Sequence, residues 1–148
     1  MRAGPPARRA REDELPRVMA LRHAVFCVEQ GVPADLEYDG LDAGAVHVVV
    51  VDDERVIGTC RLVRDGETMR LGRMAVARER RGEGLGAVIL DEAHALAREA
   101  GAREVELHAQ VAVRGFYERA GYAAEGDEFE EAGIAHVTMR RALGPLTR

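Results

Sequence analysis

The pattern of apolar and polar positions in the first half of the chain predicts one helix followed by three strands. Residues 14–29 place apolar side chains at helical spacing, and residues 46–51 form a β-branched run. Residues 52–54 form an acidic turn, and residues 55–63 follow as a second extended run, so the two runs predict a hairpin. Residues 69–76 predict a third strand.

The second half of the chain predicts two helices and three strands. Residues 85–100 carry apolar side chains at i, i+3 and i+4, which indicates a long amphipathic helix with Gly101 as its cap. We expect a strand over residues 104–109, a helix over residues 111–120 that Gly121 ends, and closing strands around the turn Ala132-Gly133. This order of elements implies a mixed α/β sheet with helices on its faces.

Length and charge limit the classes of protein to be considered. The chain has 148 residues and a net charge of −5, so we expect a single domain over residues 12–148 behind a disordered arm over residues 1–11. The charge argues against a nucleic-acid partner, and no apolar run is long enough to span a membrane. Two isolated cysteines, Cys27 and Cys60, favour reduced thiols in a cytoplasmic protein.

The residue types that are missing exclude several reaction classes. All 21 basic residues are arginine, and the chain contains no lysine and no serine. A Walker-type phosphate loop, a lysine Schiff base and a serine nucleophile are therefore excluded. No HxH, HxxxH or CxxC spacing occurs, so we expect no metal site.

A glycine-rich segment lies just before the long helix. Residues 80–86 read Arg-Arg-Gly-Glu-Gly-Leu-Gly. Glycines let the backbone approach a ligand closely, and the free amides of a helix N-terminus attract anions, so the segment favours a pyrophosphate or other anion site. A flexible connection that carries solvated charges is the alternative. A Rossmann fingerprint fails because Ile89 occupies the position of its last glycine.

An ordered set of motifs resembles the GNAT N-acetyltransferases. Arg81-x-x-Gly84-x-Gly86 after the strand end Arg73-Met74-Ala75-Val76 is similar to their acyl-CoA signature, and Phe116-Tyr117-x-x-x-Gly121-Tyr122 resembles a second element of the superfamily. Segments 21–33, 107–110 and 131–137 resemble the ElaA-type branch in particular. The resemblance covers residues 14–141. It implies a GNAT-like single domain, with a mixed, mostly antiparallel sheet flanked by helices on both faces.

The resemblance also implies acetyl-CoA as cosubstrate and assigns its contacts. Main-chain amides of one segment hold the pyrophosphate: Arg81, Gly82, Glu83, Gly84, Leu85 and Gly86. The main chain of the preceding strand contacts the pantetheine arm, through Met74, Ala75 and Val76, while Met74 also suits core packing. The side chain of Arg80 or Arg81 adds a charged contact or is solvated. Gln110 stands where many family members have an asparagine that contacts the cofactor. Tyr117 is the last residue for which the resemblance implies a cofactor contact.

Catalysis needs a proton donor and a base. Tyr117 matches the family tyrosine that protonates the departing thiolate, and a packed ring that bonds a backbone carbonyl is the alternative. An alkylammonium acceptor must lose a proton before it attacks. His108 and His136 are the first candidates for this base, and a structural role is open for both; the further candidates are His47, Glu29 and Glu37.

The leading hypothesis is an acetyl-CoA-dependent N-acetyltransferase that transfers acetyl to the primary amine of a small molecule by direct attack. The alternatives are a protein or peptide N-acetyltransferase and a non-catalytic acyl-CoA-binding module. Glu37, Asp39 and Asp42 lie in an acidic segment that either attracts a cationic acceptor or is a solvated loop. A homodimer is a further open expectation.

Overall fold

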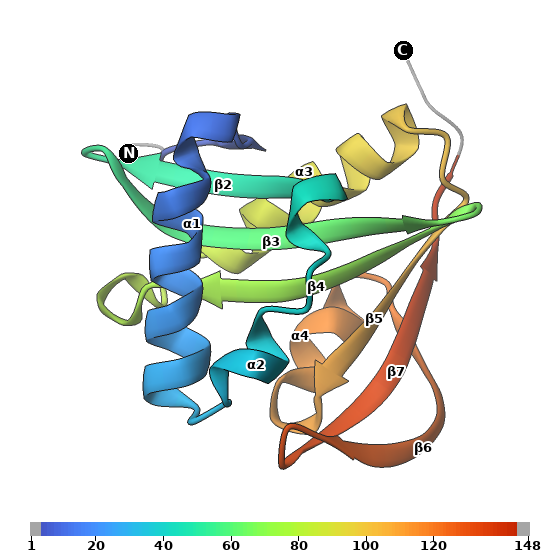
Figure 1. Cartoon of the computed structure of the whole chain (residues 1–148). Helices are drawn as coiled ribbons and strands as arrows, with labels where there is room; N and C mark the ends of the chain where they lie inside the picture. The colour runs from blue at the N-terminus through green and yellow to red at the C-terminus, as the bar shows by residue number, and fades with distance from the viewer. Residues whose placement is uncertain (1–3, 145–148) are drawn as a thin grey trace.

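A computed structural model describes residues 4–144 of the chain, which fold around one mixed sheet (Figure 1). The sheet has seven strands in the order β1-β2-β3-β4-β5-β7-β6. The strands are β1 (Ala7–Arg9), β2 (Val46–Asp52), β3 (Arg55–Asp65), β4 (Thr68–Val76), β5 (Glu104–Gln110), β6 (Ala123–Glu131) and β7 (Ile134–Ala142). The α-helices are α1 (Leu15–Arg22), α2 (Ala34–Glu37), α3 (Leu85–Glu99) and α4 (Arg114–Arg119).

Neighbouring strands of the described sheet are antiparallel except β4 and β5, which run parallel. Two tight hairpins have left-handed residues in their turns, at Asp53 and Glu54 between β2 and β3 and at Ala132 and Gly133 between β6 and β7. Two consecutive residues with positive φ match the twist of the flanking strands. The crossover from β4 to β5 contains α3, as a parallel connection requires.

Helices cover both faces of the sheet, with α1 in front of the strands and α3 behind them in Figure 1. The side of α3 that faces the sheet buries residues at helical spacing, including Ile89, Ala93 and Ala97. Gly58 on β3 allows this close approach, because a Cβ there would lie 2.6 Å from Cδ1 of Ile89. The packing of α3 fixes where its N-terminus lies at the end of β4.

The expected strands and long helix are confirmed to within a few residues at their ends, and so is the fold class. The first helix is longer than α1, because a π-helical segment, η2 (His23–Glu29), continues it to the predicted end. Short 3-10 segments flank several elements: η1 (Glu12–Glu14), η3 (Asp42–Gly44), η4 (Arg78–Arg80) and η5 (Val111–Val113).

The N-terminal arm requires a correction. Residues 7–9, expected to be disordered, form β1 and pair with residues 48–50 at the edge of β2. The Arg8 side chain also binds the buried Glu14 carboxylate with two contacts of 2.7 Å, which fixes the arm against η1. Residues 1–3 of the expected arm and residues 145–148 of the expected domain lie outside the described part of the chain.

Candidate active site

The two parallel strands separate partway along their length. β4 pairs with β5 from Thr68 opposite Glu104 to Leu71 opposite Leu107. Both strands continue beyond this point without further pairing to each other within the described sheet, and Figure 1 shows them diverging. The edge of β4 over residues 72–76 therefore offers main-chain groups to an extended ligand.

A β-bulge in β4 lies at the start of this opening. The register between β3 and β4 shifts between Thr59 and Arg61, which leaves one extra residue in β4. Arg73 in the bulge has a φ of 56°, in a region that residues other than glycine rarely adopt. The bulge comes directly before residues 74–76, the segment for which the sequence predicts pantetheine contacts.

The glycine segment leads from the end of β4 into α3. Gly82 and Gly84 have φ values of 84° and 80°, and Gly84 caps α3 without a side-chain hydrogen bond. Among the described residues, the backbone hydrogen bonds outside the helices and strands include none donated by the amides of residues 81–86. A Cβ at either glycine would meet no protein atom, so the space above the loop is open. Free amides at the positive end of a 15-residue helix suit a pyrophosphate.

Both arginines of this segment already have carboxylate partners. Arg80 contacts Asp52 at 2.8 Å and Glu83 at 2.9 Å. Arg81 contacts Glu29 at 2.8 Å and donates to the Val76 carbonyl at 3.0 Å. The hydrogen bond from Arg81 also lowers the pKa of Glu29. For either guanidinium to contact a phosphate, it would have to share or give up its carboxylate partners. The main-chain amides of the loop are therefore the groups that are free to bind a phosphate.

Tyr117 lies on α4 and is 7% exposed. Its ring packs edge-on against Phe116 and Tyr122, with centroid distances of 5.0 and 5.8 Å. Burial raises the pKa of its hydroxyl, with a smaller effect from the Cys60 thiol nearby. The described residues give this hydroxyl no hydrogen bond that counters the shift. Tyr117 therefore keeps its proton at neutral pH.

Tyr122, which packs against Tyr117, belongs to a buried hydrogen-bonded cluster that the sequence did not indicate. His94 on α3 lies 2.6 Å from the Tyr122 hydroxyl through Nε2 and 2.6 Å from Nη1 of Arg141 through Nδ1. Since arginine only donates, Nδ1 of His94 accepts and Nε2 carries the proton that it donates to Tyr122. The tyrosine at the end of the second motif was the available signal, because a buried phenol needs a partner.

The two histidines chosen as base candidates come together on one face of the sheet. His108 on β5 lies 2.9 Å from Oε1 of Glu131 through Nδ1, and its ring meets Phe129 edge-on at 5.0 Å. His136 on β7 stacks on Phe129 at 6.1 Å and lies 3.9 Å from Oε2 of Glu131. We call these four residues the imidazole cluster. Phe129 and Glu131 lie on β6 and were not predicted to take part.

Gln110 is close to the opening but is bonded to a neighbour. Its amide nitrogen donates to Oε1 of Gln30, which follows the π-helical segment, at 3.0 Å. The contact holds the end of η2 beside the end of β5. The amide is within reach of a ligand in the opening only if this exposed bond exchanges.

Three carboxylates of the acidic segment are paired with arginines from other elements, which corrects one expectation. Glu37 is 2% exposed and its carboxylate lies 2.9 Å from Arg22 and 2.6 Å from Arg73. It is therefore neither a free base nor an attraction for a cationic acceptor, because two buried or half-buried arginines already bind it.

The other two carboxylates of the segment are also paired. Asp39 contacts Arg61 at 2.8 Å, and this hydrogen bond lowers the pKa of Asp39. Asp42 contacts Arg61 at 3.1 Å and Arg22 at 2.6 Å, and its carbonyl lies 3.0 Å from Nε2 of His47. The expectation that this segment steers a cationic acceptor is wrong, since the arginines cancel its charge. His47 is buried within the same network and is not a candidate base.

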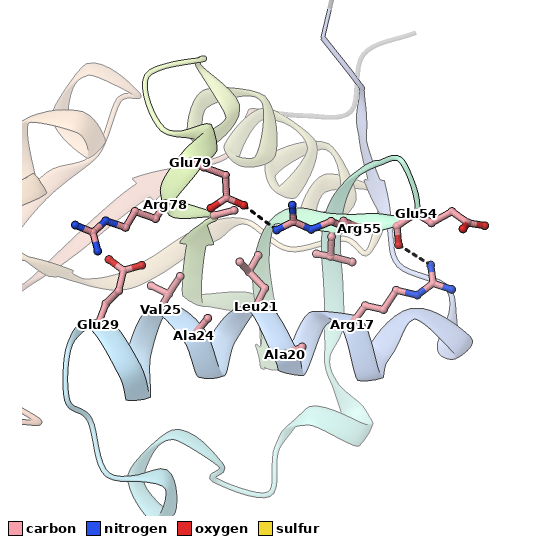
Figure 2. A pocket seen from close by; sticks show the side chains of 12 residues that line it. Arg17, Ala20, Leu21, Ala24, Val25, Glu29, Glu54, Arg55, Arg78 and Glu79 are labelled. Atoms are coloured by element: carbon pink, nitrogen blue, oxygen red, sulfur yellow. Dashed lines mark hydrogen bonds and ion pairs between the residues drawn. The ribbon is translucent and has the colours of Figure 1, made fainter.

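An open pocket of about 330 Å³ lies beside the glycine segment (Figure 2). Its floor includes Leu21 and Val25 from the first helix, and its rim holds the ion pair of Arg55 with Glu79 at 2.7 Å. Of the residues predicted to bind the cofactor or to act as acid or base, Glu29 alone lines it. Glu29 connects the two regions, since it lines the pocket and binds Arg81.

Other classes of site receive no support from the described residues. They contain no group of histidine, cysteine and carboxylate side chains placed to hold a metal ion. None of the helices in residues 4–144 has the length and apolar character that spanning a membrane requires. Both cysteines are free thiols.

Comparison with known proteins identifies the family. The chain matches the acetyltransferase (GNAT) domain over residues 10–143. It is 35% identical over 132 residues to the uncharacterized N-acetyltransferase YjcF of Bacillus subtilis, covering 88% of this chain and 94% of that one. Protein ElaA of Escherichia coli is 29% identical over 135 residues, which is 88% of each chain.

Solved structures give the same result. The crystal structure of Escherichia coli ElaA matches with a TM-score of 0.82 over 91% of this chain and 97% of that one, at 24% identity. An acyl-CoA N-acyltransferase from Pseudomonas aeruginosa matches with a TM-score of 0.82 at 29% identity, over 92% of this chain and 97% of that one. The resemblance drawn from the motifs is confirmed. The chain belongs to the GNAT acetyltransferase family, resembles its ElaA-type branch, and is an acyltransferase with acetyl-CoA as cosubstrate.

Proposed function

We propose that the protein transfers the acetyl group of acetyl-CoA directly to the primary amine of a small molecule. The observation that carries this proposal is the position of His108 where β4 and β5 separate, together with the protonated hydroxyl of Tyr117. His108 is the first residue of β5 beyond the last pairing with β4, and its side chain alternates with the buried Leu107 and Ala109. Tyr117, a buried phenol that keeps its proton, lies on α4.

Acetyl-CoA supplies an activated acetyl thioester, and the residues of this chain bind and orient it. We assign the pyrophosphate to the free amides of residues 81–86 and the pantetheine arm to the main chain of residues 74–76, with Gln110 as a further contact. A strand amide in the bulged region is suited to stabilising the charge that develops on the acetyl oxygen.

Proton transfer is assigned to three side chains. His108 or His136 removes a proton from the acceptor ammonium, which frees the nitrogen lone pair for attack on the acetyl carbon. As the new C–N bond forms and the C–S bond breaks, Tyr117 donates its proton to the departing sulfur. The attacking nitrogen loses its second proton to give the neutral amide, and this proton restores the Tyr117 hydroxyl through solvent. Direct attack is favoured over a covalent acyl-enzyme because Cys60 is 1% exposed and burial raises the pKa of its thiol.

The form of the acceptor side favours a small molecule. Residues 34–42, which lie between the first helix and the sheet, are tied to β3 and β4 through Arg61 and Arg73. A segment held in this way walls the site instead of leaving an open groove for a polypeptide. A protein or peptide acceptor and a binding module without turnover are the outcomes that would replace this proposal.

Thiol release from acetyl-CoA tests it, measured against monoamines, polyamines, amino acids and peptides, with the product mass as a second readout. We expect turnover with a small primary amine and a mass increase of one acetyl group. Turnover with peptides alone would contradict the choice of acceptor. Calorimetric binding of acetyl-CoA without turnover across both panels would indicate a binding module. The cytoplasmic location and the homodimer stay predictions.

A further inference from the structure

We propose that Glu131 is the positioning residue that selects His108 as the general base and presents its Nε2 to the acceptor amine. The inference rests on the acetyl transfer proposed above and goes beyond it, because it assigns a role to a carboxylate and decides between two histidines. It is carried by the hydrogen bonds of the imidazole cluster.

The bond to Glu131 fixes which nitrogen of His108 carries the proton. Nδ1 of His108 lies 2.9 Å from Oε1 of Glu131. An ionised carboxylate only accepts hydrogen bonds, so in the neutral imidazole Nδ1 carries the hydrogen and Nε2 keeps its lone pair. The edge-on contact with Phe129 at 5.0 Å limits rotation of the ring. His108 is thus oriented as a base by a carboxylate, which also stabilises the imidazolium that forms after proton transfer.

His136 is held differently. Its Nδ1 lies 2.7 Å from the carbonyl oxygen of Ile134, which also only accepts, so Nδ1 is the donor. The remaining nitrogen, Nε2, lies 3.9 Å from Oε2 of Glu131, and the side chain is 9% exposed. His136 is therefore enclosed against its own hairpin, whereas the His108 side chain is 43% exposed. A base has to reach its substrate, so exposure favours His108.

The hairpin of β6 and β7 places these groups on one face. Glu131 and Ile134 close the turn at Ala132 and Gly133, and Phe129 pairs with His136. Phe129 and Glu131 are two residues apart on one strand, so their side chains lie on the same face. Cross-strand pairing of His136 with Gln110 and of Thr138 with His108 brings β5 onto that face.

The neighbouring charges leave Glu131 as the carboxylate that acts on His108. On β5, Glu106 is bound by Arg140 and lies 3.7 Å from Arg70. Gln110, the next residue of β5 on the same face, is uncharged and bonded to Gln30, which follows η2. Facing His108 from β6 and β7 are Glu131 and His136, while Glu125, which pairs with Thr138 opposite His108, is bound by Arg140 at 3.0 Å. Removal of the Glu131 charge therefore changes the orientation of His108 without a second carboxylate to replace it.

The test compares Glu131→Gln with Glu130→Gln. The two substitutions remove the same charge from adjacent positions of β6, but Glu130 lies on the opposite face and pairs with Ala135. A glutamine at 131 can accept or donate, so it no longer dictates the tautomer of His108. We expect Glu131→Gln to lower kcat by about tenfold, because an exposed charge-assisted bond is lost, with little change in KM for acetyl-CoA. Glu131→Asp should recover part of the loss, and Glu130→Gln should lose less than twofold.

A spectroscopic readout does not depend on activity. Two-bond ¹H–¹⁵N spectra of the imidazoles should show His108 with its proton on Nδ1 in the unmodified protein and in Glu130→Gln. In Glu131→Gln, a substantial fraction should move to the Nε2–H form. A His108 that is already protonated on Nε2 in the unmodified protein overturns the inference.

The choice between the histidines is tested by two asparagine variants. Asparagine at either position keeps a donor for the bond made by Nδ1 and removes Nε2. His108→Asn should lower kcat by about 10²-fold, the range for loss of a general base, and His136→Asn by less than tenfold. The reverse order would show that His136 is the base. If no amine is acetylated by the unmodified protein, the proposed function fails, while the tautomer spectra still decide the pairing of Glu131 with His108.

Discussion

The stability of the protein should decrease on mild acidification because of one buried histidine. His94 is 2% exposed, and burial, reinforced by the positive charge of Arg141, lowers its pKa from 6.5 to about 4. Its Nδ1 accepts from Arg141 at 2.6 Å, so a proton added to Nδ1 would face a guanidinium. The folded state therefore excludes a proton that the unfolded chain binds below pH 6.5.

The size of the effect follows from the two pKa values. Because the folded pKa is the lower one, the stabilising contribution is complete above pH 6.5 and is lost as the pH falls toward 4. The free energy of unfolding should fall by about 2 kcal/mol between pH 7.5 and pH 5, and by about 3 kcal/mol in total at pH 4. This is a large part of the 5–15 kcal/mol, roughly, that stabilises an ordinary domain.

Urea unfolding at pH 7.5, 6, 5 and 4 measures this loss, with His94→Gln as the matched variant. Glutamine does not titrate, and its amide can accept from Arg141 and donate to Tyr122. The variant should be less stable than the unmodified protein at pH 7.5 but should lack most of the decrease between pH 7.5 and 5. Carboxylates with lowered pKa values, such as Glu14, contribute little between pH 7.5 and 5, because the stability that they add is lost only as the pH falls through the unfolded pKa of 4.5 toward the folded value. Equal slopes for the two proteins would refute the assignment to His94.

Four further substitutions test the site and the fold. Gly84→Val should weaken acetyl-CoA binding at least tenfold by calorimetry, because a branched side chain at a φ of 80° blocks the loop amides, and unchanged affinity in a folded variant would exclude the loop. Tyr117→Phe should lower kcat about 10²-fold with acetyl-CoA affinity retained, and an unchanged kcat would move the proton donor elsewhere. Glu37→Gln should destabilise by about 3 kcal/mol in urea, since it leaves Arg22 and Arg73 short of a charge, whereas a solvated glutamate would cost almost nothing. Glu54→Gly should raise the free energy of unfolding by about 0.5 kcal/mol, because a glycine adopts the φ of 62° without strain, and a loss of stability would contradict the turn geometry.

The sequence predicted those elements whose formation depends on a local pattern of apolar residues. The β-branched run at residues 46–51 and the amphipathic period of residues 85–100 gave β2 and α3, because burial of one face determines each of them. β1 was missed since Ala7–Arg9 has no apolar alternation and is held by pairing to β2 and by the contact of Arg8 with Glu14. A short edge strand of this kind depends on its neighbours more than on its own sequence.

In the candidate site too, local sequence predicted some features, and others depend on contacts between distant parts of the chain. The glycine segment was found because its function depends on backbone freedom, which glycine spacing reveals. The charges were misjudged because Glu37, Asp39 and Asp42 meet arginines from other parts of the chain, such as Arg73 on β4. The contacts of His94 with Tyr122 and Arg141, and of Glu131 with His108, likewise join separate elements. No local pattern reports such pairs.

The neutralised acidic segment has a structural role at the β-bulge. Arg73 adopts a φ of 56°, which costs about 1 kcal/mol or more for a residue with a side chain, and glycine would avoid this cost. The arginine instead contacts the Glu37 carboxylate at 2.6 Å, the Glu37 carbonyl at 2.9 Å and Asp39 at 3.2 Å. These contacts offset the strain and join residues 37–39 to the strand that opens away from β5. The acidic segment therefore acts on the shape of the opening through Arg73, and its charge is not available to select the acceptor.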